Sequence, residues 1–309
     1  MINQVVFSEI KDRWNNAFDK NTLHAPFLTW NWHNTWFQTL GKNSVPFTYI
    51  IDDSIIASFV LTDSTLMFSG GEEIADYLDI IGPEEKKGDA WNQIIQLVQS
   101  QDFKKLLLRN VPEHSGTIQY FKTIVNATID KEDTTPSLQL PKSWEVFVES
   151  LGKKYTHELE RKIRKFDREH PDVEIIESTQ VAVDIDILFS LMERDEAKKA
   201  FLTPDMKHFF TEISKTFSDT VSLRYIKSGD KRIAATMSFI MDNTHFLYNS
   251  GFDKECCSIA GFYLKAINIK YAIEHGATTY NFLQGNERYK YELGGKDYPV
   301  YTIALPFSF

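Results

Sequence analysis

One stretch near the end of the chain decides how the rest of the sequence is interpreted. It reads Asn281-Phe282-Leu283-Gln284-Gly285-Asn286-Glu287-Arg288-Tyr289-Lys290. The apolar residues that lead into it predict a strand over Thr278–Leu283, and the polar residues beyond Gly285 predict a short helix near Glu287. Titratable side chains that directly follow a strand are typical of a functional site.

A three-strand meander and a helix are expected before this stretch. The meander runs are rich in β-branched and aromatic residues and cover Val221–Lys227, Arg232–Met241 and Thr244–Ser250. The Gly, Asp and Asn residues between these runs tolerate positive φ and therefore predict tight turns. A buried helix over Gly261–His275 follows, and Gly276 supplies its C-terminal stop.

The loop between the meander and this helix is a candidate anion site. Its last four residues are Ser258, Ile259, Ala260 and Gly261. No acidic residue occurs between Glu255 and Glu274. The first N–H groups of a helix lack partners within the helix, and the helix dipole favours negative charge there. We therefore expect a cofactor phosphate at Ser258–Gly261.

The first half of the chain repeats this order of elements. The expected elements are a strand (Ile2–Phe7), two helices (Ser8–Phe18, Thr29–Leu40), a meander (Phe47–Ile51, Ile55–Leu61, Thr65–Ser69), a helix (Asp89–Ser100), a strand (Lys105–Arg109) and a helix from about Glu113. In addition to the elements given above, the second half is expected to contain a strand (Val173–Glu177), two helices (Val183–Lys198, Asp205–Phe217) and a last strand (Val300–Ala304). A linker over residues 130–141 and a long helix over Ser143–Glu169 would join the copies. The repeat predicts a mixed α/β protein with an N-terminal domain (1–135) and a C-terminal domain (136–309).

The two copies differ in the loop that follows the meander. In the first copy it reads Gly70-Gly71-Glu72-Glu73-Ile74-Ala75-Asp76-Tyr77-Leu78-Asp79. Its four carboxylates would repel a phosphate. A phosphorylated cofactor is therefore expected in the C-terminal domain.

Composition excludes several classes of protein. The chain has 309 residues and a formal net charge of −9, which argues against broad nucleic-acid binding. The sequence contains no run of about eighteen apolar residues, so no membrane span is expected, and Met1–Trp14 does not resemble a signal peptide. Cys256 and Cys257 are adjacent, and the histidines lack ligand spacing, so no disulfide framework and no metal site are expected. A cytoplasmic location is the plain expectation.

The segment Lys153–Arg168 is a local basic exception. It combines an apolar stripe at helical spacing with a basic face made by Arg161, Arg164, Lys165 and Arg168. The basic face is either a solvated surface balanced by nearby acids or an attractor for a phosphorylated substrate. We favour the solvated surface, because charge runs are usually that.

These residues together resemble tandem GNAT-fold acyltransferases. More narrowly, the chain is similar to the CelD/BcsL-like group, acetyltransferases involved in cellulose biosynthesis that are related to the FemABX transferases. The resemblance rests on the Trp30–Trp36 helix, Asp76–Asp79, Leu140-Pro141 with Trp144, the basic helix, Ser258–Gly261 and the stretch 281–290. That group commonly shows Asp-Phe-Leu-x-Gly-x-Glu-x-Tyr-Lys in this stretch, whereas this chain begins it with Asn281.

The resemblance implies two tandem GNAT-like domains, each with a mostly antiparallel sheet flanked by helices. It also implies that acetyl-CoA or another acyl-CoA donates an acyl group to an amine or hydroxyl of a small molecule, a sugar or a cell-envelope precursor. In the GNAT fold strands four and five splay, which implies main-chain oxyanion donors around Tyr248–Gly251. We expect Glu287 to deprotonate the nucleophile, Tyr289 to act as an acid, and Lys290 to hold an anionic group.

Other interpretations stay open at this point. Glu287 is equally well explained as a helix-start acid paired with Arg288 or Lys290, and Ser258 as an ordinary N-cap. If Glu287 is not the base, the base is water or a group of the first domain such as Asp76 or Asp79. The whole protein could also be a FemABX-like transferase that uses aminoacyl-tRNA, or a non-catalytic binding module that keeps the tandem fold.

Overall fold

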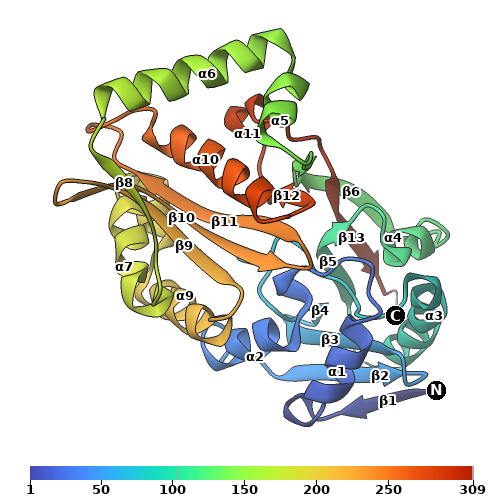
Figure 1. Cartoon of the computed structure of the whole chain (residues 1–309). Coiled ribbons are helices and arrows are strands. Elements are labelled where there is room, and N and C mark those ends of the chain that lie inside the picture. Colours follow the sequence, from blue (N-terminus) through green and yellow to red (C-terminus); the bar gives the residue numbers. More distant parts are fainter. Residues whose placement is uncertain (102, 308–309) are drawn as a thin grey trace. The chain divides into compact units, whose positions relative to one another are not determined.

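The computed structural model describes residues 1–101 and 103–307, which form two compact units (Figure 1). The first unit holds Met1–Thr134 and the end of the chain from Tyr298, and the second holds Thr135–Asp297. Each unit contains one sheet flanked by helices, so the mixed α/β class predicted from the sequence is confirmed. None of the helices in the described residues combines the length and apolar character that a membrane span needs.

The sheet of the first unit has the order β1-β2-β3-β4-β5-β13-β6. Its strands are β1 (Ile2–Val5), β2 (Pro46–Ile51), β3 (Ile55–Thr62), β4 (Thr65–Phe68), β5 (Lys105–Pro112), β6 (Thr128–Thr134) and β13 (Pro299–Pro306). Its helices are η1 (Phe7–Glu9), α1 (Lys11–Phe18), η2 (Pro26–Leu28), α2 (Trp30–Gln38), α3 (Glu84–Gln99) and α4 (Gly116–Phe121).

Alternation of side chains along the strands gives the first sheet two apolar faces. Ile56 on β3 packs with Trp14 of α1 on one face. Phe59, three residues further along the same strand, lies 6.1 Å from the buried ring of Trp91 of α3. Residues three apart in a strand point to opposite faces, so α1 and α3 cover opposite sides of the sheet.

The sheet of the second unit has the order β7-β12-β11-β10-β9-β8. Its strands are β7 (Ser137–Gln139), β8 (Val173–Glu177), β9 (Val221–Ser228), β10 (Lys231–Met241), β11 (Thr244–Phe252) and β12 (Thr279–Asn281). Its helices are α5 (Trp144–Ser150), α6 (Gly152–Glu169), α7 (Val181–Met192), α8 (Glu196–Phe201), α9 (Pro204–Thr216), α10 (Ala260–Glu274) and α11 (Arg288–Glu292).

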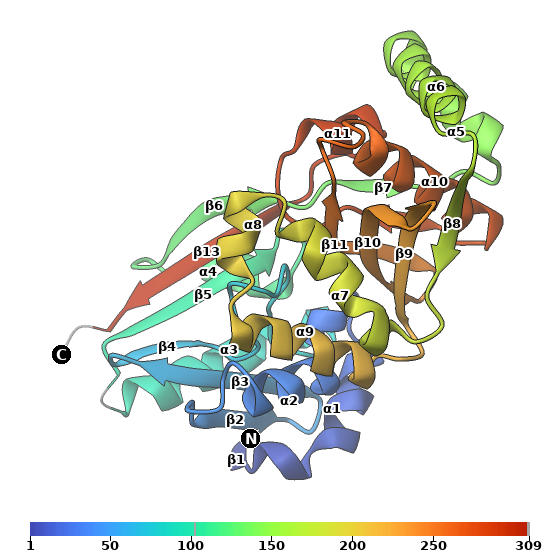
Figure 2. The same ribbon diagram turned by 90° about the vertical axis from the view of Figure 1, so that its left-hand side faces the viewer.

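Helix α10 is the central helix of the second unit. It lies along one face of the sheet, with α7 and α9 on the other face (Figure 1). Phe147 of α5 and Leu159 of α6 are buried in one cluster with Ala266 and Ile269 of α10. Helices α5 and α6 therefore cover α10 on the side away from the sheet (Figure 2).

Strands β11 and β12 separate after a short pairing. They are parallel neighbours only from Thr244↔Thr279 to Phe246↔Asn281, whereas β11 continues to Phe252. On its other side β11 stays paired with β10, with a β-bulge at Tyr248 that shifts the register. From residue 247 to residue 252, the edge of β11 is no longer paired with β12. We call this edge the second fork.

The first sheet contains a similar opening. Strands β4 and β5 are parallel neighbours from Thr65↔Lys105 to Met67↔Leu107, and β5 continues to Pro112. We call the edge of β5 from residue 108 to residue 112 the first fork. Both units thus share the meander followed by two parallel strands that diverge, which is the repeat seen in the sequence.

Several expected boundaries were wrong. The long helix expected over Ser143–Glu169 is two helices, because Gly152, the first residue of α6, has φ +73° and interrupts the helical path. The helix expected over Val183–Lys198 is also split. The carboxylate of Asp195 accepts hydrogen bonds from the N–H groups of Ala197 and Lys198 and so begins the separate helix α8. The expected linker over residues 130–141 contains most of β6 and all of β7.

The last strand also lies elsewhere than expected. The strand Val300–Ala304 was expected in the second copy, but β13 pairs with β5 and β6 in the first sheet. The chain therefore returns to its first unit after completing the second. The proposed domain boundary near residue 135 stays a prediction.

Candidate active site

The stretch 281–290 folds into a tight loop around one buried lysine. The ammonium of Lys290 donates to the main-chain carbonyls of Leu283 at 2.9 Å, Gln284 at 2.5 Å and Gly285 at 3.1 Å. It also lies 2.9 Å from Oε2 of Glu287. The Lys290 side chain is only 2% exposed, so its three protons are used inside the protein.

Glycine and a left-handed residue make this loop possible. Gly285 has φ +110°, and a Cβ there would lie 2.4 Å from Oε2 of Glu287. Leu283 has φ +58° and its N–H donates to the side-chain oxygen of Asn281 at 2.8 Å. Asn281 therefore closes the end of β12 with an amide oxygen, a contact that an aspartate oxygen would make equally well.

Glu287 and Tyr289 differ in how far their side chains are exposed to solvent. Glu287 precedes the first residue of α11, makes no capping bond there, and its side chain is 57% exposed. Burial raises the pKa of the Tyr289 phenol well above its usual value, and the nearby charge of Glu287 raises it further. At neutral pH Tyr289 therefore holds its proton, while Glu287 is accessible from solution.

Two further lysines, which the sequence analysis did not single out, lie beside this loop. Lys265 of α10 is 4% exposed, with its ammonium 4.7 Å from the ring centre of Tyr289. Burial, helped by the charge of Lys198, lowers the pKa of Lys265 to about 7. Burial likewise lowers the pKa of Lys198, although Asp195 and Glu287 oppose the shift.

Lys198 connects this cluster to the second fork. Its ammonium donates to the carbonyl of Ser250 at 2.5 Å. In an extended strand the N–H and C=O of one residue point to the same side. The N–H of Ser250 therefore also points to the free edge of β11, which is where Tyr248–Gly251 were expected to offer oxyanion donors.

The expected donor loop lies at the start of α10. Ser258 is exposed, and Ala260 and Gly261 are buried in the first turn. In the part of the chain that the structure describes, the N–H groups of Ser258, Ile259, Gly261 and Phe262 have no main-chain acceptor. Gly261 has a packing reason, because a Cβ there would lie 2.7 Å from the ring of Phe252.

One acid lies close to the donor loop. The carboxylate of Asp253 accepts the N–H groups of Glu255 at 3.1 Å and Cys256 at 3.0 Å. It occupies amides just before the loop and leaves those of Ser258 and Gly261 unpaired. An anion is thus still accommodated at the helix start, but with a negative charge nearby.

The basic face of α6 is balanced by acids of the same helix. Arg161 pairs with Glu158 at 2.8 Å and Arg164 with Glu160 at 3.2 Å. Lys165 and Arg168 both lie within 4.0 Å of Glu169, at 3.9 and 3.5 Å. These pairs favour the solvated-surface interpretation of the basic segment.

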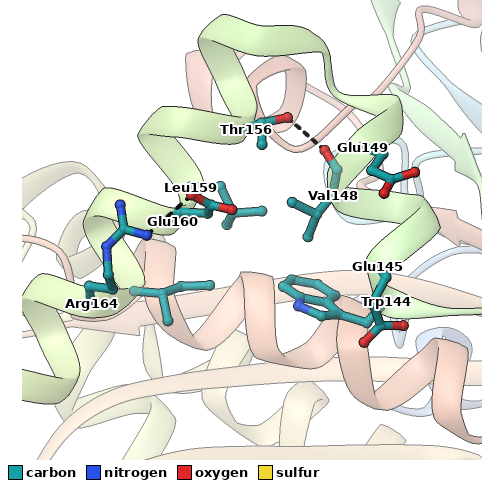
Figure 3. Close-up of a pocket in the computed structure, with 9 residues that line it drawn as sticks. Trp144, Glu145, Val148, Glu149, Thr156, Leu159, Glu160 and Arg164 are labelled. Atoms are coloured by element: carbon teal, nitrogen blue, oxygen red, sulfur yellow. Dashed lines mark hydrogen bonds and ion pairs between the residues drawn. The ribbon is translucent and has the colours of Figure 1, made fainter.

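A separate cavity of about 410 Å³ lies between α5 and α6 (Figure 3). The side chains of Trp144, Val148 and Leu159 point into it, and Thr156 closes one end with a 2.7 Å hydrogen bond to the carbonyl of Val148. Its lining includes Arg164 of the basic face but none of the expected catalytic or donor-loop residues. Within residues 1–101 and 103–307, no group of three His, Cys, Asp or Glu side chains is placed to hold a metal ion.

Part of the second unit is similar to a known family. Residues 153–291 match the family model described as Acetyltransferase (GNAT) domain. This stretch of the chain is similar to GNAT acetyltransferase domains. That match covers the second fork, the donor loop and the loop around Lys290, but less than half of the chain. No curated protein matches the sequence.

Solved structures extend the likeness over the whole chain. FemX has a TM-score of 0.65 at 10% identity, covering 98% of this chain and 96% of its own. The C-terminal domain of a putative lysylphosphatidylglycerol synthetase from Agrobacterium fabrum has 0.65 at 10%, covering 97% and 92%. A tandem GNAT protein from the clavulanic acid biosynthesis pathway has 0.54 at 10%, covering 100% and 99%. At such identities the likeness shows the fold, and the two-sheet architecture is consistent with tandem GNAT-like domains.

Of the two lysines that were not expected at the site, only Lys265 could have been recognised from the sequence. Lys265 is four residues from Gly261 and from Ile269, both buried, so it lies on the apolar side of α10. A lone lysine at such a position is a candidate for a perturbed pKa. Lys198 gave no such signal, because its partner Ser250 is distant in sequence.

Proposed function

We propose that the GNAT domain transfers an acyl group, with acetyl as the first to test, from acyl-CoA to an amine or hydroxyl. The acceptor would be a small molecule, a sugar or a cell-envelope precursor. The observation that carries this proposal is the edge of β11 at Ser250, where the carbonyl accepts from Lys198, whose ammonium also interacts electrostatically with Glu287.

The donor loop fits a phosphorylated donor in part. The unpaired N–H groups of Ser258, Ile259, Gly261 and Phe262 converge at the start of a 15-residue helix without acids in its first turn. These groups would hold the donor diphosphate. A bound acyl-CoA supplies the activated thioester carbonyl, and every other contribution comes from the protein.

The second fork would stabilise developing charge. Main-chain N–H groups on the free edge of β11, that of Ser250 among them, would donate to the thioester oxygen as it becomes negative. Such fixed donors need no reorganisation during the reaction, and one is typically worth about 10²–10³ in rate. Lys198 adds a positive charge on the same edge.

Glu287 would take the proton that the nucleophile loses. Its carboxylate is accessible, and Lys290 fixes one of its oxygens from the protein side. The nucleophile then forms the new bond to the acyl carbon, the carbon–sulfur bond breaks, and Tyr289 returns a proton to the thiolate. We assign Lys290 to positioning Glu287 and the loop, because its protons already bond to four acceptors.

Lys265 is a second group that could move a proton. With a pKa of about 7, a large share of it is a neutral amine at neutral pH. Its ammonium lies over the ring of Tyr289, 4.7 Å from the ring centre, and its described hydrogen bond goes to the carbonyl of Gly261, so it would restore the phenol proton after turnover through an intervening group. This role is a proton relay rather than attack on the donor.

One observation favours a different donor. The carboxylate of Asp253 next to the donor loop opposes binding of a diphosphate. An aminoacyl-tRNA, as in FemABX-like transferases, would present its ester carbonyl to the same fork without requiring that loop. This is the second candidate function.

Native mass spectrometry of the purified protein tests which donor applies. We expect an adduct with the mass of CoA or an acyl-CoA, which added acetyl-CoA should increase. Salt-sensitive binding of tRNA without any CoA adduct would instead support the second candidate. Binding of neither would leave a fold that has lost transferase activity.

A further inference from the structure

A second pocket of about 560 Å³ lies immediately before the donor loop in the chain. It is lined by Arg194, Lys231, Arg232, Asp253, Glu255 and Cys256. Lys231 and Arg232 begin β10, and Asp253 follows the end of β11, its neighbour in the sheet. The pocket is therefore built on the same sheet edge from which the donor loop leaves.

The lining of this pocket holds three cations and two carboxylates, so it carries one net positive charge. Asp253 is occupied by two loop N–H groups, and its other oxygen lies 3.8 Å from Arg194. Arg232 donates to the carbonyl of Asp230 at 2.9 Å. Among the described residues no carboxylate lies within ion-pair distance of Lys231 or Arg232, although Glu255 contributes one negative charge to the lining.

We propose that this pocket binds the 3′-phosphate of a CoA donor. The inference rests on the proposed function, since it requires that the diphosphate occupy the loop Ser258–Gly261. In CoA the 3′-phosphate and the diphosphate are attached to the same ribose, so a second anion site must adjoin the first. Cys256, at the pocket, is only two residues before Ser258.

The chemistry of the lining suits a phosphate monoester. Near neutral pH a monoester carries close to two negative charges and three acceptor oxygens. Arg232 offers a planar guanidinium with side-by-side donors, and Lys231 a mobile point charge. The site would therefore distinguish CoA from dephospho-CoA, which differs only by this group.

Calorimetric titration with CoA and with dephospho-CoA tests the assignment. The wild-type protein should bind CoA about tenfold more tightly, as expected for one charge-assisted contact. Lys231→Glu and Arg232→Glu should each lose that preference while still binding dephospho-CoA. Lys215→Glu is the matched control, because it reverses the charge of an exposed lysine on α9, outside this pocket, and should keep the preference.

Each outcome has a distinct meaning. Equal binding of the two nucleotides by the wild type, or a preference that survives both pocket variants, would overturn the pocket assignment and leave the acyl-CoA proposal standing. Failure of the wild type to bind either nucleotide would overturn both.

Alkylation of Cys256 gives a readout that needs no substitution. Cys256 is exposed whereas Cys257 is buried, so a thiol reagent should label the former first. Adenosine 3′,5′-bisphosphate should slow that labelling more than AMP at equal concentration. Equal protection by the two nucleotides would contradict a 3′-phosphate at this pocket.

Discussion

The two forks begin alike and are completed differently. Beyond the β4–β5 pairing, the segment 72–78 of the first unit is hydrogen-bonded to β5. The N–H of Leu78 donates to the carbonyl of Asn110 at 3.0 Å. The side chain of Asn110 donates in turn to the carbonyls of Glu72 and Ala75, at 2.9 and 2.7 Å. Beyond the β11–β12 pairing, the carbonyl of Ser250 instead accepts from a lysine side chain. One fork is filled by an acidic segment, and the other presents main chain and cations.

The buried charges of the two units differ in the same way. Lys87 lies 2.7 Å from Asp79, and both side chains are at most 2% exposed. Ser115 and Thr117 complete the shell of Asp79, so this ion pair fixes the acidic segment in place. Lys265 of the second unit is as deeply buried, but the acceptor found for it is the carbonyl of Gly261, at 3.4 Å. A buried charge left without an acid is costly and is typical of function rather than stability.

The largest effect should come from breaking the ion pair of the first unit. Lys87→Met leaves the carboxylate of Asp79 buried without its cation, which typically costs about 3–5 kcal/mol. We expect urea denaturation to show a loss of that size, while CoA titration of the folded protein stays unchanged. Lys86→Met, at the exposed neighbouring position, should change stability little. A loss below about 1 kcal/mol at Lys87 would mean that the segment is held by other contacts.

The next effect concerns turnover in the second unit. Glu287→Gln keeps an oxygen for Lys290 but removes the base, so kcat should fall about 100-fold or more with donor affinity unchanged. Steady-state kinetics with acetyl-CoA and a responsive acceptor measures this. Glu73→Gln, in the acidic loop of the first unit, is the matched control and should leave kcat unaltered. Normal turnover of Glu287→Gln would reduce Glu287 to a helix-start charge.

A smaller effect should report on Lys265. Its pKa is about 7 in the folded protein against an ordinary 10.5, so between these values the unfolded chain binds a proton that the folded protein lacks. Stability is therefore lost as the pH falls through this range. Lys265→Met should be more stable than wild type at pH 7, and its advantage should shrink as the pH rises.

Urea denaturation of both proteins between pH 7 and pH 9.5 measures that difference. Lys270→Met, on the exposed side of the same helix, should show no such trend. A difference between Lys265→Met and wild type that does not vary with pH would show that Lys265 keeps an ordinary pKa.

The smallest effect concerns the acid beside the donor loop. Asp253→Asn retains an acceptor for the loop N–H groups but removes a negative charge near the start of α10. Charges near a helix terminus are worth about 0.3–1 kcal/mol, so CoA should bind about two- to fivefold more tightly. Titration calorimetry resolves such a change. Weaker binding would indicate that Asp253 supports the donor loop rather than opposing the donor.

The local fold could be predicted from sequence where turn chemistry is explicit. The meander strand expected over Val221–Lys227 is Val221–Ser228, and the turn that follows contains Gly229 at φ +58°. The helix expected over Gly261–His275 is Ala260–Glu274, because Gly276 at φ +78° ends it. Positive φ at such residues fixes element ends without reference to the rest of the chain.

Tertiary partners could not be predicted in this way. The pattern of Val300–Ala304 indicates a strand but carries no information about which sheet receives it. Likewise, Lys290 was expected to meet a ligand, yet its protons bond to carbonyls of residues 283–285, a geometry created by the left-handed Leu283 and by Gly285. The pKa of Lys265 depends on burial, which follows from packing rather than from neighbours in sequence.

The central claim is that the donor binds at the second unit, at the start of α10, and calorimetric titration of CoA tests it most directly. Gly261→Glu should abolish binding, and Ser258→Glu should do the same at an exposed position where no contact with Phe252 disturbs folding. The control is Gly88→Glu in the first unit, where an added side chain meets nothing within 4 Å. We predict wild-type affinity for Gly88→Glu and no detectable binding for the other two variants. Unchanged CoA affinity in folded Ser258→Glu and Gly261→Glu would contradict a donor site at this helix.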